Sequence, residues 1–367
     1  MARDSWSVLP TDLLSLVLNL VSFHDLVRLT AVCKSWRQPV LDGLQRRHPN
    51  LPWIISFDNG KFRKLDLCDP WLKKSYSLVK TIRRDGVKKL LLGTSAHASK
   101  YGWLLLSKQE VKSHGSSSIS YLFYNPFCNK IIKLPPLYLS KDKHASKAMF
   151  STTPTAPDCV IFVLSQVFVT REKKVIYMLS TCKDKKWTSF LTTDGWGGSY
   201  VQDAVHMDGK FYCVFNQLYR SYFKLGIFNV ALQEWSIEQY YWPEGWFMQN
   251  RSMHYLIEFD GELFLVTTPC SFSWKIWQFD RSRKTWTRTK SLGDRVLFLN
   301  HMPSSPSSMA AVGEAMEFAN MIVHLGRSGY KTFTCKDDQG DWTHHQTRDW
   351  YRRPEHSFWI DSPNFQT

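Results

Sequence analysis

The sequence predicts a mainly β chain with a small helical unit at its front. Aromatic residues make up 15% of the 367 residues, and aromatic side chains favour strands. Short apolar segments recur at a nearly constant interval through most of the chain. The first 48 residues differ, because their apolar residues are spaced as in amphipathic helices. We therefore expect a helical domain at residues 1–48 and a β domain at residues 49–367.

Composition and cysteine spacing exclude several classes of protein. No apolar run approaches the roughly 18 to 20 residues that a membrane-spanning helix needs, and the first residues lack the pattern of a signal peptide. The eight cysteines lie at least 23 residues apart, so no C-x-x-C pair is available for zinc or redox chemistry. Such scattered thiols are typical of a reducing compartment. We expect a soluble protein of the cytoplasm, the nucleus or both.

The chain is basic, with a formal net charge of +15. Residues 61–100 alone contain eleven basic and three acidic residues. Such a surface could attract nucleic acid or an acidic protein partner. The alternative is a set of solvated lysines at strand edges and turns, which discourage aggregation.

The helical front divides into three short helices. The first begins with Thr11 or Asp12 as its cap, the second begins at His24 or Asp25, and the third runs from Ser35. The apolar stripe of the first helix consists of Leu13, Leu14, Val17, Leu18 and Val21. Each helix is apolar over more of its circumference than a three-helix unit can bury internally. The excess apolar surface either binds a partner or docks on the β domain.

Four segments of this front, in order and spacing, resemble the F-box motif: Leu9-Pro10, residues 12–14, residues 24–29 and residues 32–37. The resemblance implies docking to a Skp1-type adaptor, and through it to the cullin and RING subunits of a ubiquitin ligase. Carried over onto this sequence, the adaptor contacts are Leu9, Pro10, Leu13, Leu14, Val17, Leu26, Val27, Leu29, Val32, Cys33 and Trp36. Leu16, Leu18 and Leu20 fit apolar positions of the motif too. The sequence does not separate contact residues from residues of the helical core.

The β domain contains a repeat. Residues 208–237 and 260–289 both run through Asp-Gly, an alternating strand, a polar turn, a second strand ending in Phe-Asn or Phe-Asp, and a Trp. Weaker copies extend the repeat, and the successive last-strand markers lie 53, 48, 51 and 56 residues apart, at Leu134, Trp187, Trp235, Trp286 and Trp342. A period near 50 with about four strands per unit is typical of β-propeller blades. A two-sheet sandwich would also give short strands, but not this period.

The number of blades is left open between five and seven. The first strand-like segment after the helices lies at residues 51–67, and the last lies at residues 357–365. Either could close the ring by pairing with the other. Asp-Gly and Asn-Pro pairs mark tight turns, which need a positive or a fixed φ.

Beyond the F-box, residues 123–137, 203–214, 291–299 and 357–363 are similar to the kelch-like, DUF295-like β-propeller domain of plant F-box proteins. Kelch repeats usually carry a Gly-Gly pair in each blade. Here Gly197-Gly198 is the only such pair, so the propeller is expected to be kelch-like rather than a true kelch domain.

No common nucleotide, nucleophile or zinc motif occurs. His344-His345 is the nearest approach to a metal pair, but neighbouring residues on a strand point to opposite faces. We expect no catalytic residue, no metal and no cofactor, since the F-box resemblance places ubiquitin chemistry on other subunits. Two aromatic loops at residues 194–200 and 240–255 either bind a target or pack between blades. The candidate target contacts are Trp196, Tyr200, Trp242, Trp246 and Arg251.

These observations predict a non-catalytic substrate-recognition subunit of an SCF-type ubiquitin ligase, in which the F-box docks the adaptor and the propeller binds a target protein. One alternative is a scaffold that binds the adaptor without ligase turnover. Another is a basic propeller that binds nucleic acid through residues 61–100.

Overall fold

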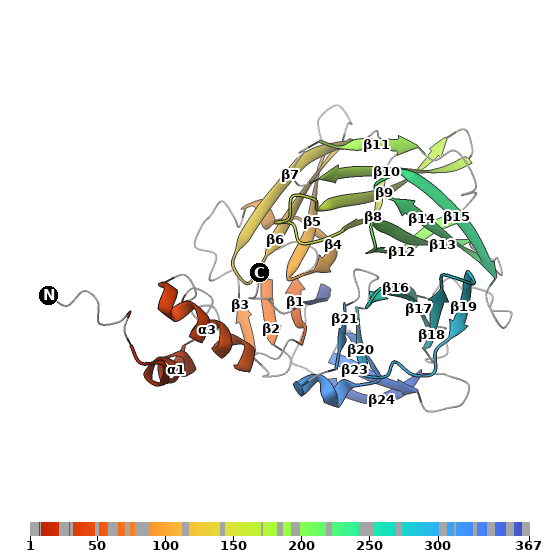
Figure 1. The fold of residues 1–367 in the computed structure, drawn as a ribbon. Helices are drawn as coiled ribbons and strands as arrows, with labels where there is room; N and C mark the ends of the chain where they lie inside the picture. Colours follow the sequence, from red (N-terminus) through yellow and green to blue (C-terminus); the bar gives the residue numbers. More distant parts are fainter. Residues whose placement is uncertain are drawn as a thin grey trace.

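The fold is described from a computed structural model. It describes residues 7, 9–21, 29, 32–47, 51–57, 65–69, 74–77, 89–111, 117–139, 144–169, 172–181, 186–191, 199–217, 222–241, 253–268, 274–300, 307–311, 313–325, 329–335, 342–349 and 356–361. Within these residues the chain forms two α-helices beside a ring of six β-sheets (Figure 1). The predicted mainly β fold is confirmed, and the open blade number resolves to six.

Each sheet is one blade. The strands of each blade are given in order from the central channel outward. Blade 1 consists of β25 (His356–Ile360), β1 (Trp53–Phe57), β2 (Leu65–Asp69) and β3 (Lys74–Ser77). Blade 2 consists of β4 (Ser95–Lys100), β5 (Trp103–Val111), β6 (Ser117–Asn125) and β7 (Lys130–Leu139). Blade 3 consists of β8 (His144–Phe150), β9 (Val160–Val169), β10 (Glu172–Thr181) and β11 (Thr188–Leu191).

The other three blades follow in chain order. Blade 4 consists of β12 (Ser199–Met207), β13 (Lys210–Gln217), β14 (Tyr222–Asn229) and β15 (Glu234–Tyr241). Blade 5 consists of β16 (Met253–Phe259), β17 (Glu262–Thr268), β18 (Lys275–Asp280) and β19 (Thr285–Arg288). Blade 6 consists of β21 (Ser307–Ala310), β20 (Arg295–Leu299), β22 (Met321–Leu325), β23 (Gly329–Cys335) and β24 (Trp342–Asp349).

Blade 6 departs from the plain four-stranded pattern. Its innermost strand, β21, folds back on β20, and the 3₁₀ helix η2 (Gly313–Phe318) then leads to β22. As a result β20 and β22 pair in parallel, whereas all the other strand pairs described in the ring are antiparallel. The extra strand explains why the last repeat interval, 56 residues between Trp286 and Trp342, is the longest.

The ring is closed by strands from its two ends. The last strand, β25, pairs antiparallel with β1, with Ile54 opposite Trp359. The innermost strands contact one another in the order β25, β4, β8, β12, β16, β21, and β22 of blade 6 meets β25 again. The strands that pair lie in the two segments, 51–67 and 357–365, for which the sequence left ring closure open. Closure stacks each blade between two neighbours, which buries apolar surface of the sheets and is the physical reason for the ring.

Two kinds of turn repeat from blade to blade. The inner hairpins of blades 2, 4 and 5 turn at Tyr101-Gly102, Asp208-Gly209 and Asp260-Gly261, and both residues of each pair have positive φ. The outer hairpins of the same blades begin with Asn125, Asn229 and Asp280, whose side-chain oxygens each accept hydrogen bonds from two backbone N–H groups of the turn. The Phe-Asn and Phe-Asp signals of the repeat therefore mark these Asx turns.

The marker tryptophans lie at the outer strands and pack against the preceding blade. The Trp187 indole N–H donates to the Pro135 carbonyl of blade 2 at 2.8 Å. The Trp235 ring lies 5.9 Å from that of Phe162 in blade 3, and the Trp286 ring lies 6.0 Å from that of Phe223 in blade 4. In blade 6, the backbone of Trp342 exchanges two hydrogen bonds with Trp274. The roughly 50-residue period thus reflects contacts that hold the ring together.

The helices sit at the side of the ring (Figure 1). Helix α1 (Thr11–Leu20) begins after Pro10, whose carbonyl accepts the first helical hydrogen bond from the Leu14 N–H. The expected cap at Thr11 or Asp12 is wrong, since Pro10 occupies the N-cap position and no side chain caps the helix. Helix α3 (Lys34–Arg47) corresponds to the expected third helix. The expected starts of the second helix, His24 and Asp25, lie outside the described residues.

Candidate functional site

Helix α1 has two apolar faces. Leu14 and Leu18 point inward and are 2% and 3% exposed. They belong to the same buried cluster as Trp36 and Val40 of α3, and this cluster continues into blade 1 through Trp53. The helical unit therefore shares its core with the propeller, which is the docking that sequence reasoning left open.

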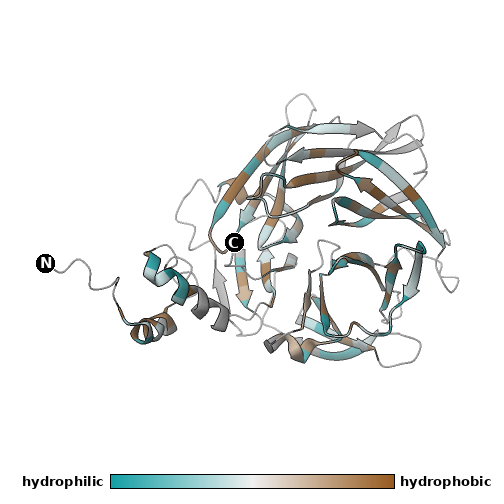
Figure 2. Cartoon of the chain, viewed as in Figure 1, coloured by the Kyte–Doolittle hydropathy of each residue, from teal (hydrophilic) through white to brown (hydrophobic). Residues whose placement is uncertain are grey.

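The opposite face of α1 is apolar and exposed. Leu13, Leu16 and Val17 are 50%, 62% and 37% exposed, and their spacing of three and four residues places them on one side of the helix. Val32, just before α3, is 59% exposed. Figure 2 shows brown, hydrophobic residues along α1. We call Leu13, Leu16 and Val17 the α1 face.

The predicted adaptor contacts fall into four groups. Those that are exposed are Pro10, Leu13, Val17 and Val32. Those half-buried against the core are Leu9, Leu29 and Cys33. Those buried in it are Leu14 and Trp36. Those outside the described residues are Leu26 and Val27. A hydrogen bond with the Ser35 hydroxyl lowers the pKa of the Cys33 thiol.

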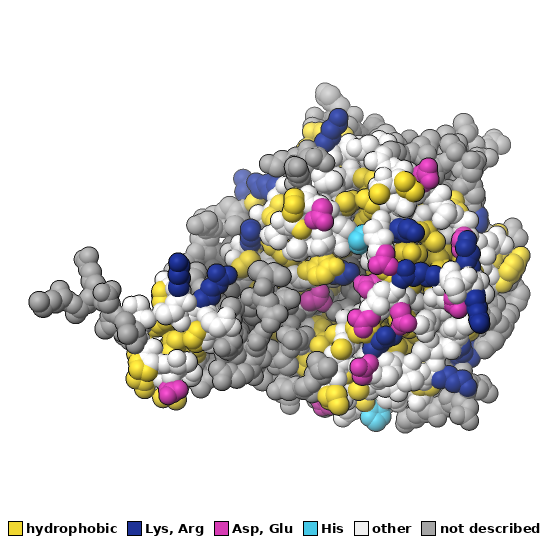
Figure 3. Space-filling model, viewed as in Figure 1, with side chains coloured by type: hydrophobic (Ala, Val, Ile, Leu, Met, Phe, Trp, Pro, Cys, Tyr) yellow, Lys and Arg dark blue, Asp and Glu magenta, His cyan; other side chains and the backbone are white. Residues whose placement is uncertain are grey.

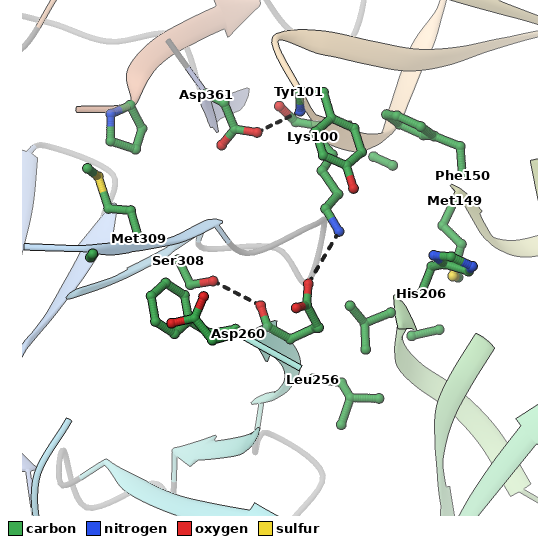
Figure 4. A pocket seen from close by; sticks show the side chains of 18 residues that line it. Lys100, Tyr101, Met149, Phe150, His206, Leu256, Asp260, Ser308, Met309 and Asp361 are labelled. Carbon is green, nitrogen blue, oxygen red and sulfur yellow. Dashed lines mark hydrogen bonds and ion pairs between the residues drawn. The ribbon is translucent and has the colours of Figure 1, made fainter. Parts of the chain in front are cut away.

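A second candidate site lies at one mouth of the central channel. The inner strands β4, β8, β12, β16 and β21 line a cavity of about 470 Å³, together with residues that flank β1 and β25. The inner hairpin turns at Tyr101 and Asp260 belong to its wall. Figure 4 shows the lining side chains converging from several blades. Cavities of this size commonly hold small ligands or side chains of a partner.

An ion pair crosses this mouth. The ammonium of Lys100, at the end of β4, lies 3.7 Å from a carboxylate oxygen of Glu258 on β16. Blades 2 and 5 are opposite one another in the six-membered ring, so this pair spans the channel (Figure 4). The Lys100 ammonium also lies 5.0 Å from the centre of the Tyr101 ring. Glu258 in turn accepts a hydrogen bond from the Gly261 N–H through its other oxygen.

Neighbouring polar groups fix the rim. Asp361, just after β25, accepts a hydrogen bond from the Tyr101 N–H at 2.6 Å and so joins blade 1 to blade 2. The Ser308 hydroxyl donates to the Glu258 carbonyl at 3.0 Å and joins blade 6 to blade 5. Because both contacts cross between blades, the positions of the rim residues depend on neighbouring blades and not on a single loop.

His206 of β12 lines the same cavity as a neutral imidazole. Burial lowers the pKa of His206 to about 4, and the nearby Lys100 ammonium acts in the same direction. The Asp208 carboxylate and a hydrogen bond with the Ser151 backbone oppose the shift. The side chain therefore carries no charge near neutral pH.

The cavity is acidic although the chain is basic. Among the described residues, its lining contains one cation, Lys100, and three carboxylates, Glu258, Asp260 and Asp361. Figure 3 shows acidic side chains gathered toward the centre of the ring on the viewed face. Met149, Phe150 and Met309 supply apolar wall between these charges.

Of the predicted target contacts, only Tyr200 lies within the described residues, and it is not part of the described lining of this cavity. Trp196, Trp242, Trp246 and Arg251 lie outside the described residues. Tyr200 lies near the start of β12, whereas His206 lies near its end, roughly 20 Å away along the strand. Sequence reasoning did not identify Lys100, His206 or Glu258. The Asp-Gly turns were the available signal, since they mark the channel-mouth ends of two inner strands.

Metal ligands, a membrane-spanning helix and the basic stretch can be followed only in the described part of the chain. Among the described residues no group of His, Cys, Asp and Glu is arranged to hold a metal ion. No helix in the described part of the chain is both long and apolar enough to cross a membrane. Of the basic stretch at 61–100, only residues 65–69, 74–77 and 89–100 are described.

Comparisons with known proteins agree with both halves of the chain. A model of F-box-like domains matches residues 6–51, and a model of the KIB1-4 beta-propeller matches residues 75–322. The chain is 26% identical over 308 residues to the F-box/kelch-repeat protein At1g57790 of Arabidopsis thaliana, covering 82% of this chain and 78% of that protein. It is also 26% identical over 377 residues to the Arabidopsis F-box protein At4g00893, covering 98% of this chain and 87% of that protein.

Among solved structures, the SapL1 lectin in complex with alpha methyl fucoside is 8% identical, with a TM-score of 0.41 over 81% of this chain and 96% of the lectin. A likeness this weak has no bearing on function. The propeller model, in contrast, covers more than half of the chain. The chain belongs to the KIB1-4 beta-propeller family, and it carries an F-box-like domain in front of its propeller.

Proposed function

We propose that this protein is the substrate-recognition subunit of an SCF-type ubiquitin ligase. The observation that carries the proposal is the α1 face. Leu13 and Leu16 are half or more exposed, although Leu14 and Leu18 of the same helix are buried in the core. Large apolar side chains gathered on one exposed face mark an interaction site. This face belongs to the segment that matches the F-box-like model.

The α1 face is the proposed contact with a Skp1-type adaptor. Leu14 and Trp36 are assigned a supporting role, because they are buried and hold α1 against α3 and blade 1. The shared core couples the two halves of the chain. A partner bound at α1 would therefore hold the propeller in a defined position.

The mechanism is proximity. The adaptor and cullin bring the ubiquitin-charged enzyme close to the propeller, and the propeller holds the target. The effective concentration of target lysines at the ubiquitin thioester then rises far above their concentration in solution. No residue of this chain is required to react.

The test is co-purification of the full chain with a Skp1-type adaptor and a cullin. The double variant Leu13→Glu, Leu16→Glu places two charges on the α1 face without touching the buried cluster. We expect at least about a tenfold loss of adaptor binding, because a buried charge at the centre of an interface costs more than 1.4 kcal/mol. Leu232→Glu is the matched control, since Leu232 is 65% exposed in a turn of blade 4.

Three results would count against the proposal. The wild type could bind no adaptor, or the double variant could bind as well as the wild type does. Binding of adaptor without cullin would instead support the scaffold alternative. Nucleic-acid binding is checked separately by its salt dependence, which is steep when phosphates are neutralised.

A further inference from the structure

The channel-mouth cavity combines an excess of negative charge with apolar walls. In the part of the lining that the structure describes, Glu258, Asp260 and Asp361 place three negative charges against the one positive charge of Lys100. Lys100 is already engaged, since its ammonium pairs with Glu258 at 3.7 Å and lies over the Tyr101 ring. A ligand entering the cavity therefore meets a net negative potential, in a chain whose overall charge is +15.

The apolar wall sets the shape of what fits. Met149, Phe150, Leu256, Phe259 and Met309 contribute side chains between the charged groups. A long side chain with an aliphatic stem and a cationic end matches this lining, because the stem packs on apolar surface while the charge reaches the carboxylates. The volume of about 470 Å³ exceeds one such side chain and leaves room for its neighbours in a peptide.

An anionic ligand fits less well. It would approach three carboxylates and would have to compete with Glu258 for Lys100, the one cation among the described lining residues. His206 does not help such a ligand, because its imidazole is neutral near pH 7. Like charges brought together at an interface are strongly unfavourable.

We propose that the channel mouth binds an arginine or lysine side chain from an apolar segment of a target protein. The inference deepens the proposed function. It rests on that function only in naming the bound protein as a target of the ligase. The recognition itself depends on Glu258, Asp260 and Asp361 and on the apolar wall. It does not depend on α1.

The test starts from a random dodecapeptide display library selected on the full chain. We expect the enriched peptides to share an arginine or lysine beside apolar residues. One enriched peptide is then synthesised with a fluorescent label, and a second copy carries citrulline in place of its arginine, or norleucine in place of its lysine. Polarisation titrations give the affinity of both peptides for the wild type and the variants. Loss of the positive charge is expected to weaken binding about tenfold or more.

Two variants change the cavity charge in opposite directions. The double variant Glu258→Gln, Asp260→Asn removes two negative charges and keeps the acceptor for the Gly261 N–H. It is expected to lower the affinity for the cationic peptide about tenfold, and by more at low salt. Lys100→Met removes the competing cation and is expected to strengthen binding. Glu234→Gln, on the exposed edge of blade 4, is the matched control and leaves affinity unchanged.

Several outcomes would overturn the inference: no enriched peptides, an acidic consensus, equal binding of the charged and neutral peptides, or weaker binding by Lys100→Met. Failure of the proposed function is seen separately, in the adaptor co-purification. All cavity variants are expected to retain the adaptor. A chain that binds the basic peptide but no adaptor would keep this inference and remove the ligase proposal.

Discussion

The Lys147 ammonium lies 2.6 Å from a carboxylate oxygen of Asp203, and both side chains are buried. The pair joins β8 of blade 3 to β12 of blade 4. The second oxygen of Asp203 accepts a hydrogen bond at 2.9 Å from the Leu256 N–H of blade 5. One carboxylate therefore connects three consecutive blades beside the channel.

Breaking this pair on one side is expected to destabilise the fold. Lys147→Met leaves a buried carboxylate without its cation, at a cost of about 3 to 5 kcal/mol in the free energy of unfolding. The double variant Lys147→Met, Asp203→Asn is expected to lose less than the sum of the single variants, since no buried charge remains and Asn can still accept from Leu256. Denaturant unfolding of the wild type, both single variants and the double variant measures these free energies. Strictly additive losses would show that the two residues do not stabilise each other.

The closing strand β25 should be a weak point when its tryptophan is removed. Trp359 is 1% exposed, its indole N–H donates to the Leu299 carbonyl and its backbone N–H donates to Asn300. Trp359→Ala is expected to cost about 3 to 5 kcal/mol by leaving a cavity where the two chain ends meet. Trp359→Phe should cost less, because most of the volume remains. Equal unfolding midpoints for Trp359→Ala and the wild type would contradict this role.

The inner hairpin turn of blade 5 depends on a left-handed backbone. Gly261 has φ +72, and a Cβ placed there would meet nothing closer than 3.9 Å. The cost of Gly261→Ala is therefore conformational, about 1 kcal/mol. Gly261→Asn is expected to cost less, because Asn tolerates the left-handed region better than Ala. Thermal unfolding of the two variants shows which is less stable. An Asn variant less stable than the Ala variant would rule out this explanation.

Stability is expected to fall as the pH falls below 7. Burial lowers the pKa of His97 from 6.5 to about 4, and burial likewise lowers the pKa of His254 to about 3. The unfolded chain therefore binds more protons than the folded chain between pH 6.5 and about 4. This contribution to stability is complete above pH 7 and is lost as the pH falls through that window. For His97 it amounts to about 1 to 2 kcal/mol between pH 7 and pH 5.

His97→Gln tests the assignment, because Gln can keep the hydrogen bond that His97 makes with Ser107. The variant should show a flatter dependence of unfolding free energy on pH than the wild type does. His345→Gln is the control, since His345 is exposed on β24. An unchanged slope in His97→Gln would assign the acid sensitivity to other groups.

The local and repeating features of the chain can be predicted from its sequence alone. The Asp-Gly turn at 260–261, the Asx turn at Asp280 and the marker Trp286 could all be read in order, because turn chemistry and strand alternation depend on neighbours in the chain. The helical front was equally readable from its apolar spacing. Its division into contact and core residues was not, because Leu13 and Leu14 have the same chemistry.

The number of blades that close the ring, and the residues that meet at its centre, follow from packing between distant parts of the chain. Lys100 and Glu258 are 158 positions apart in the chain, and they meet because blades 2 and 5 face each other across a six-bladed ring. Leu14 is buried and Leu13 is exposed because α1 packs on α3 and blade 1 through one face. Such contacts depend on long-range packing, so a local sequence pattern does not predict them.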